Sequence, residues 1–90
     1  MIPAYFIRAY KFKKVSPTRC SLEVEKNEAF ICICKQLYTV KKKNKIIPVY
    51  KVIWENESFV VFELKKQCYM IEETCIKEIK EDIKKIIMED

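Results

Sequence analysis

The sequence predicts an α+β fold, in which an antiparallel β-sheet of four to five strands is followed by a long C-terminal amphipathic helix packed on the sheet. As far as Leu64, apolar residues alternate with polar ones between short turn sequences, which is the period of half-buried strands. From Ile71 onwards, isoleucines recur every three or four residues, which is the period of a helix. A block of strands followed by a helix is typical of an α+β fold.

Two strands are expected at the N-terminal end. The first covers Ala4–Lys14, where the aromatic side chains point away from the neighbouring lysines. Pro17 ends it, because proline has no amide hydrogen to donate to a strand ladder. The second covers Cys20–Glu25, which alternates cleanly, and Asn27 then offers a turn in a chain that contains no glycine.

The segment Ala29–Val40 fits two interpretations. Its β-branched and aromatic residues are typical of a strand, because they crowd the turns of a helix and suit a pleated surface. We therefore interpret it as one long strand, although a helical stripe also fits four of its apolar residues: Phe30, Ile33, Leu37 and Val40.

An exposed lysine-rich loop is expected at Lys41–Lys45, between the long strand and the next one. Ile46–Trp54 resumes the extended pattern, and Pro48 within it favours a sheet edge or a bulge. A turn follows at residues 55–58, and Phe59–Leu64 forms another strand.

Three of these segments, Ala4–Ala9, Ala29–Val40 and Ile46–Trp54, carry apolar residues on both faces. One helix covers only one face of a sheet, so the other face would leave an apolar patch exposed. We expect either a homodimer or an unidentified protein partner to cover that patch.

The tail from Ile71 to Met88 is expected to be one helix, with acidic residues in its first turn and lysines near its end, as the helix dipole prefers. The stripe places Ile79 and Ile83 at its centre, where burial would stabilise the fold most. Its members are Ile71, Cys75, Ile79, Ile83 and Ile86.

Residues 1–90 are expected to form one small domain with a single core. No apolar run approaches the ~18 residues that a membrane span needs, so we expect no membrane partner. The five cysteines are an odd number without the spacing of a disulfide framework, which indicates reduced thiols and a cytoplasmic location. Cys32 and Cys34 share one face of a strand, where thiols act as small apolar side chains, so neither a metal nor a cofactor is expected.

The chain contains neither histidine nor glycine. The first absence removes the commonest general base and metal ligand, and the second removes glycine-rich phosphate loops. Glu63 and Lys65 match half of a metal-dependent nuclease motif, but no further acidic ligand is suitably placed. We therefore expect no enzymatic activity.

Charge is distributed unevenly along the chain. Residues 1–54 hold twelve Lys and Arg against three acidic residues, a balance of +9, whereas residues 55–90 hold six against ten, a balance of −4. A basic half of this kind indicates a surface directed at an anionic partner. The candidate partner-binding residues are Arg8, Lys11, Lys13, Lys14, Lys41, Lys42, Lys43 and Lys45.

Two functions remain open. The first is a small non-enzymatic binding protein, an inhibitor or adaptor that acts on a protein partner. The chain is rich in residues with A/T-rich codons, notably isoleucine, lysine and asparagine, which fits a gene carried by a virus or mobile element. The alternative is an RNA- or DNA-binding protein without sequence specificity, which uses the basic N-terminal half.

Overall fold

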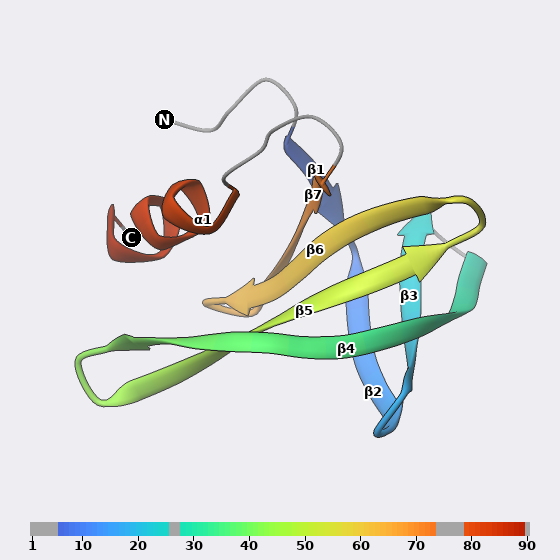
Figure 1. Ribbon diagram of the computed structural model, residues 1–90, viewed down its shortest axis with the longest axis horizontal. Helices are drawn as coiled ribbons and strands as arrows, with labels where there is room; N and C mark the ends of the chain where they lie inside the picture. The colour runs from blue at the N-terminus through green and yellow to red at the C-terminus, as the bar shows by residue number, and fades with distance from the viewer. Residues whose placement is uncertain (1–5, 26–27, 74–78, 90) are drawn as a thin grey trace.

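The computed structural model is mostly β: seven antiparallel strands form one curled sheet, and one short helix follows them in the described residues (Figure 1). The structure describes residues 6–25, 28–73 and 79–89. In chain order the elements are β1 (Phe6–Ala9), β2 (Lys11–Ser16), β3 (Arg19–Glu25), β4 (Glu28–Lys42), β5 (Lys45–Trp54), β6 (Glu57–Leu64), β7 (Gln67–Glu72) and α1 (Ile79–Glu89).

The expected α+β sheet of four to five strands with a long helix is therefore wrong. The single N-terminal strand expected over Ala4–Lys14 is divided at Tyr10 into β1 and β2, of which residues 6–14 lie in the described part. A seventh strand, β7, includes Ile71 and Glu72, which were assigned to the start of the helix, and residues 67–70, which were assigned to no element. The other expected strands, including the ambiguous Ala29–Val40, are confirmed as strands.

The strand order forces the sheet to curl. The order is β1-β7-β6-β5-β4-β3-β2, so β1 and β2 lie at opposite edges of the sheet. Only Tyr10 separates these two strands along the chain, and its amide donates a hydrogen bond to the carbonyl oxygen of Glu23 at 2.8 Å. The two edges must therefore approach each other at Tyr10, which bends the sheet into a half-barrel.

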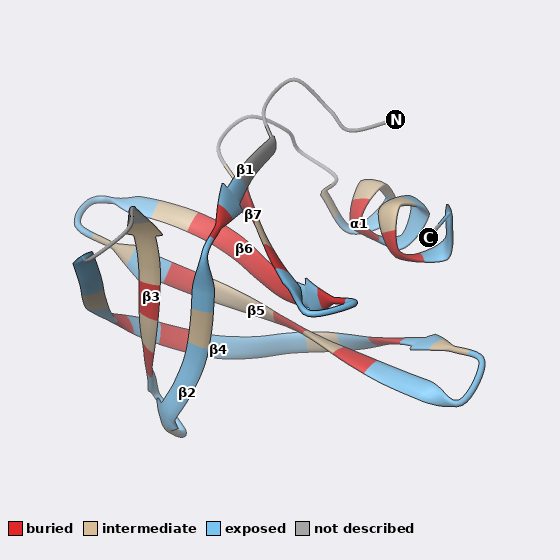
Figure 2. Ribbon diagram, turned by 180° about the vertical axis from the view of Figure 1, so that it is seen from behind, coloured by how far each residue is buried: buried red, intermediate tan, exposed pale blue. Residues whose placement is uncertain are grey.

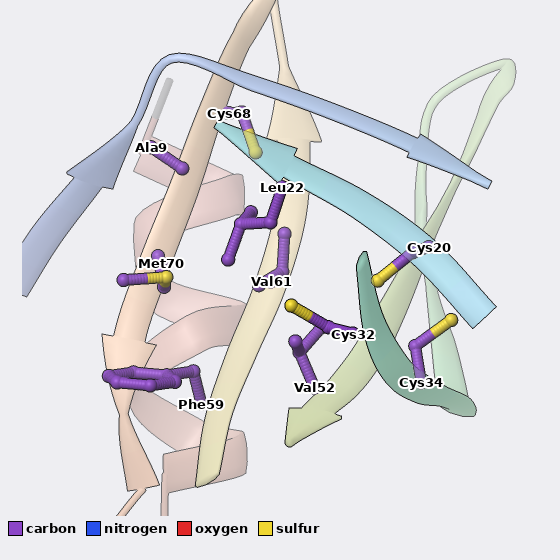
Figure 3. Packing of buried hydrophobic residues seen from close by; sticks show 10 residues of the cluster. All are labelled: Ala9, Cys20, Leu22, Cys32, Cys34, Val52, Phe59, Val61, Cys68 and Met70. Carbon is purple, nitrogen blue, oxygen red and sulfur yellow. The ribbon is translucent and has the colours of Figure 1, made fainter. Parts of the chain in front are cut away.

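The concave side of the half-barrel holds the first of two apolar clusters (Figure 3). Phe12, Phe30, Tyr50 and Trp54 border it as half-buried aromatic residues. Its buried members are Ala9, Cys20, Leu22, Cys32, Cys34, Val52, Phe59, Val61, Cys68 and Met70.

The second cluster lies on the other side of the sheet, beneath α1 (Figure 2). Ile83 and Ile87 of the helix are fully buried there, and Ile79 and Ile86 are half-buried against it. The sheet contributes Val40, Ile47, Val49, Val60, Phe62, Leu64 and Ile71. The sheet thus folds over one face of the central strands and the helix packs on part of the other, while Ile31, Ile33 and Ile53 of β4 and β5 remain exposed.

The helix is shorter than expected. Ile71 lies in β7, where it pairs with Val60 of β6 and is fully buried, so it belongs to the sheet. Cys75 lies outside the described residues. The strand was hidden in the sequence because Met70 faces one cluster and Ile71 the other, which removes the apolar–polar alternation.

A β-bulge in β4 contributes to the helix-like spacing of its apolar residues, which also lie on both faces of the strand before the bulge. Gln36 pairs with Tyr50 and Tyr38 with Val49, which leaves Leu37 as the extra residue. The inserted residue reverses the face on which later side chains lie. Apolar residues of β4 therefore stop keeping a strict period of two, and their spacing approaches that of a helical stripe.

Candidate functional site

An open groove of about 1160 Å³ lies where β5 and β6 separate. The two strands pair from Tyr50 and Val61 to Trp54 and Glu57, at the end of β5 that joins β6. Before Tyr50, β5 continues with β4 as its paired neighbour, and this two-stranded arm projects beyond β6 (Figure 1). Pro48 lies in this part of β5, as its missing amide hydrogen predicts.

Two tight hairpin turns supply the basic side chains of the groove. The β4–β5 turn contributes Lys42, Lys43 and Lys45, and the β6–β7 turn contributes Lys65 and Lys66. These turns are some twenty residues apart in the sequence. Among the described residues that line the groove, Glu63 is the one acidic residue against five lysines. The electrostatic potential in the groove is therefore strongly positive.

Three of these lysines hold an unusual backbone conformation. Lys43, Lys65 and Lys66 have φ values of 51°, 51° and 65°, in the left-handed region. This region costs a residue with a Cβ atom roughly 1 kcal/mol or more, and asparagine or glycine adopts it more easily. Other turns of the chain contain asparagine, at Asn44 and Asn56. Asparagine could therefore also have stood at the positions of these lysines, although the chain has no glycine.

Aromatic side chains line the other part of the groove. The rings of Phe12 from β2 and Tyr50 from β5 lie 5.1 Å apart between centroids, inclined at 35°. The ammonium group of Lys14 lies 5.0 Å from the centroid of the Tyr50 ring, a cation–π contact. Both rings are half-buried, so each presents part of its surface to the groove.

Lys14 is held in place at the end of the barrel. Its ammonium group donates a hydrogen bond to the carbonyl oxygen of Pro17 at 3.0 Å and lies 3.5 Å from the sulfur of Cys34. It therefore projects on the side of Phe12 and Tyr50 rather than on the outer face with Lys11 and Lys13.

The structure brings together part of the predicted partner-binding set. Lys42, Lys43 and Lys45 line the groove. Lys14 lies over the ring of Tyr50, which also lines it. The remaining four are exposed but do not line it: Arg8, Lys11, Lys13 and Lys41. Of these, Arg8 lies over the Tyr69 ring at 5.6 Å.

Sequence reasoning missed Lys65 and Lys66. The sequence carries no clear signal for them, because a pair of lysines is not a turn motif. The structure places them in the two-residue turn between β6 and β7, and Gln67–Glu72 was not recognised as a strand.

Four thiols of the described residues are buried in the concave cluster. Cys20, Cys32, Cys34 and Cys68 are free and buried, and no group of three or more potential ligands surrounds a metal position in the described residues. Burial raises the pKa of the Cys20 and Cys68 thiols to about 12 and raises that of Cys32 as well, which keeps them protonated at neutral pH.

Comparisons with known proteins give no relative from which a role could be transferred. No protein-family model, curated protein or solved structure matches the chain. Within residues 6–25, 28–73 and 79–89, no helix has the length and apolar character to cross a membrane.

Proposed function

We propose that the protein is a non-enzymatic binding protein that holds single-stranded nucleic acid in the groove, with little sequence preference. The observation that carries this proposal is the convergence of five lysines from two separate turns on a groove that also presents Phe12 and Tyr50. Proteins that bind single strands combine a positively charged groove with aromatic rings on which bases stack.

The strained lysines support a role for their charge. A lysine-rich hairpin tip also keeps a protein soluble and blocks association of strand edges. For solubility, the lysine side chains could lie on any exposed surface. Lys43, Lys65 and Lys66 instead lie on the same groove, with positive φ values. Glu55 in the β5–β6 turn also has a positive φ, of 58°, and does not line the groove, so tight turns of this chain adopt this conformation elsewhere too. The support lies in the position of all three lysines on one groove.

A single strand fits this surface better than a duplex. The bases of a duplex are stacked inside, so its phosphates could reach the lysines while its bases could not reach Tyr50. In a single strand the bases are free to turn towards the rings. The two arginines of the chain, Arg8 and Arg19, lie outside the groove. Arginine is the residue best suited to reading guanine, so we expect weak sequence preference.

The test is fluorescence anisotropy with labelled single-stranded and duplex oligonucleotides over a range of salt concentrations. The key variant is Lys43→Asn/Lys65→Asn/Lys66→Gly, which removes three charges and supplies residues that tolerate positive φ. We expect the slope of log K against log salt to fall by about 2, from roughly 0.7 per lost phosphate contact on a single strand.

A control variant has the same net charge but leaves the groove intact. Lys13, Lys84 and Lys85 are exposed and do not line the groove, and changing all three to glutamine removes an equal number of charges. The proposal predicts a much smaller loss of affinity for this control. Equal losses in both variants, or no binding at low salt, would refute it.

A second candidate function is capture of an extended acidic segment of a protein partner, as an inhibitor or adaptor would do. The observation that favours it is the edge of β2, which pairs with β3 alone in the described part of the chain. A peptide could add a strand at this edge, beside the groove. Displacement of a labelled oligonucleotide by poly-glutamate, but not by an uncharged peptide of equal length, would favour this function.

The free, buried cysteines support a reducing compartment, and we therefore extend the proposal to the cytoplasm. A gene of viral or mobile-element origin fits the same proposal, because small binding proteins without enzymatic activity are sufficient to protect or redirect nucleic acid.

A further inference from the structure

The two-stranded β4–β5 arm is not held to β6 by strand pairing. In the described residues, the pairing of β5 with β6 begins at Tyr50 and Val61, so the earlier part of β5 pairs with β4 alone. A two-stranded hairpin is only marginally stable by itself in water. The separation between the two lysine-bearing turns of the groove must therefore be set by packing.

Helix α1 packs where the arm and β6 separate, at the end of the sheet that carries both turns (Figures 1 and 2). Ile83 and Ile87 of the helix are fully buried in the second cluster. The same cluster contains Ile47 of the arm and Phe62 and Leu64 of β6, and these three residues also line the groove. The residues under the helix and the residues that line the groove therefore overlap.

Polar contacts connect each end of α1 to the arm. In the first turn of the helix, the ammonium group of Lys80 lies 5.0 Å from the centroid of the Tyr38 ring of β4. In the last turn, the carbonyl oxygen of Ile87 accepts a hydrogen bond from Lys42, which itself lines the groove. An ammonium group has three N–H donors, so Lys42 can bond the helix and an anion at the same time. The helix thus orients this lysine for the groove.

We propose that α1 positions the groove, because its packing on Ile47 and Phe62 and its contact with Lys42 fix the arm relative to β6. Docking of the helix and binding in the groove are then linked. A ligand of the groove stabilises the docked helix, and undocking lowers the affinity in proportion to the fraction of molecules in which it occurs. The identity of that ligand rests on the function proposed above, whereas the positioning is a property of the free protein.

Hydrogen exchange of the free protein, followed by NMR, tests the positioning without a ligand. Ile87→Ala removes apolar contact beneath the last turn of α1 and changes none of the residues that line the groove. The amides of residues 38–42 and 45–49 should exchange several-fold faster, together with those of the helix. Leu22→Ala is the matched control, since Leu22 is equally buried but lies in the concave cluster, and it should not single out the arm.

An arm that exchanges as slowly in Ile87→Ala as in Leu22→Ala would overturn the proposal. Ile87→Val removes one methylene group and should give a smaller change at the same amides, which keeps the test decisive if the alanine variant does not fold. Circular dichroism checks the folding of each variant.

Fluorescence anisotropy with a labelled oligothymidylate tests the link to binding. Ile87→Ala should weaken the affinity several-fold and leave the dependence on salt unchanged, because all five groove lysines remain. Leu22→Ala should keep the wild-type affinity. A wild-type protein that binds no oligonucleotide would refute the proposed function, and hydrogen exchange would then decide the positioning alone. Binding that Ile87→Ala leaves unchanged would overturn the link.

The reverse effect tests the part played by Lys42. Saturating oligothymidylate should slow the exchange of the α1 amides in the wild type, because linkage acts in both directions. Lys43→Asn removes one groove charge, keeps the contact with Ile87 and should retain this protection. Lys42→Met removes the same charge and the contact, so the protection should decrease at the same saturation. Equal protection in the two variants would overturn the role of Lys42.

Discussion

Lys42 connects the projecting β4–β5 arm to the C-terminal helix. Its ammonium group donates a hydrogen bond to the carbonyl oxygen of Ile87, in the last turn of α1, at 2.7 Å. The final carbonyl groups of a helix lack partners within the helix and carry partial negative charge. A residue predicted to bind an anionic partner thus also holds the helix on the sheet.

Lys42→Met should lower the free energy of unfolding by about 1 kcal/mol, because it removes this hydrogen bond and a favourable charge at the helix terminus. The longer apolar part of the side chain is kept. Urea denaturation measures the effect. Lys41→Met is the matched control, since Lys41 is exposed on the opposite side of the same strand, and it should change stability by less than about 0.5 kcal/mol. Equal losses would show that the contact with Ile87 contributes nothing.

The two isoleucines expected at the centre of the helical stripe should differ in importance. Ile83 is fully buried, whereas Ile79 is half-buried at the first residue of α1. Ile83→Ala should cost about 2–5 kcal/mol through lost burial and the cavity left behind. Ile79→Ala should cost distinctly less. Thermal unfolding of the two variants decides the order, and an equal loss would mean that the helix packs differently.

How far the sequence predicted the fold depended on how each strand is covered. Clean alternation identified β3, because one covered face and one more exposed face produce a period of two. Strand β6 was recognised although Phe59, Val60, Val61 and Phe62 are all buried, since these four residues are β-branched or aromatic. Reasoning from alternation failed for β7, since Met70 and Ile71 are buried on opposite faces. It was weakened for β4, where the bulge at Leu37 interrupts the alternation. The curling of the sheet could not be predicted from the sequence either. It depends on β1 and β2 lying at opposite edges of the sheet, which follows from pairings between strands far apart in the chain.

The candidate site was predicted in part for a related reason. Local charge density identified Lys42, Lys43 and Lys45, which are close in sequence. Lys65 and Lys66 reach the same groove only through the pairing of β6 with β7 and of β5 with β6. A pair of lysines is unremarkable until the topology places it beside the other turn.

The β6–β7 turn should be a site of easy stabilisation. Both central residues, Lys65 and Lys66, have positive φ, as in the type I′ turn that asparagine followed by glycine prefers. Lys65→Asn/Lys66→Gly should therefore raise the free energy of unfolding by about 1–2 kcal/mol. The same variant should bind single-stranded oligonucleotides more weakly than the wild type, since two groove charges are lost.

The two readouts of this variant must move in opposite directions. Urea denaturation gives the stability and anisotropy gives the affinity. Lys65→Gln/Lys66→Gln is the control, because it removes the same charges without relieving the strain, and it should lower affinity with no gain in stability. A stabilised variant with unchanged affinity would separate these lysines from binding.

The buried thiols give the protein a defined response to alkaline pH. Burial raises the pKa of Cys20 and of Cys68 from the ordinary 9.0 to about 12 in the folded chain. Below pH 9 both the folded and the unfolded chain keep these protons, and the stabilising effect of the protonated thiols is complete. As the pH rises from 9 towards 12, the unfolded chain loses the protons first, so this contribution to stability is lost.

The same protonation protects the thiols from modification, because alkylating reagents attack the thiolate. Iodoacetamide at neutral pH should modify the unfolded protein readily and should leave Cys20 and Cys68 of the folded protein almost untouched, as mass spectrometry of the digested protein can show. Raising the pH above 9 in the folded state should speed the reaction less than it does for a free cysteine. Cys20→Ala should show a shallower loss of stability with pH than the wild type. Rapid modification of Cys20 in the native protein at neutral pH would show that the concave cluster opens to solvent, and the fully buried position of this thiol would then be wrong.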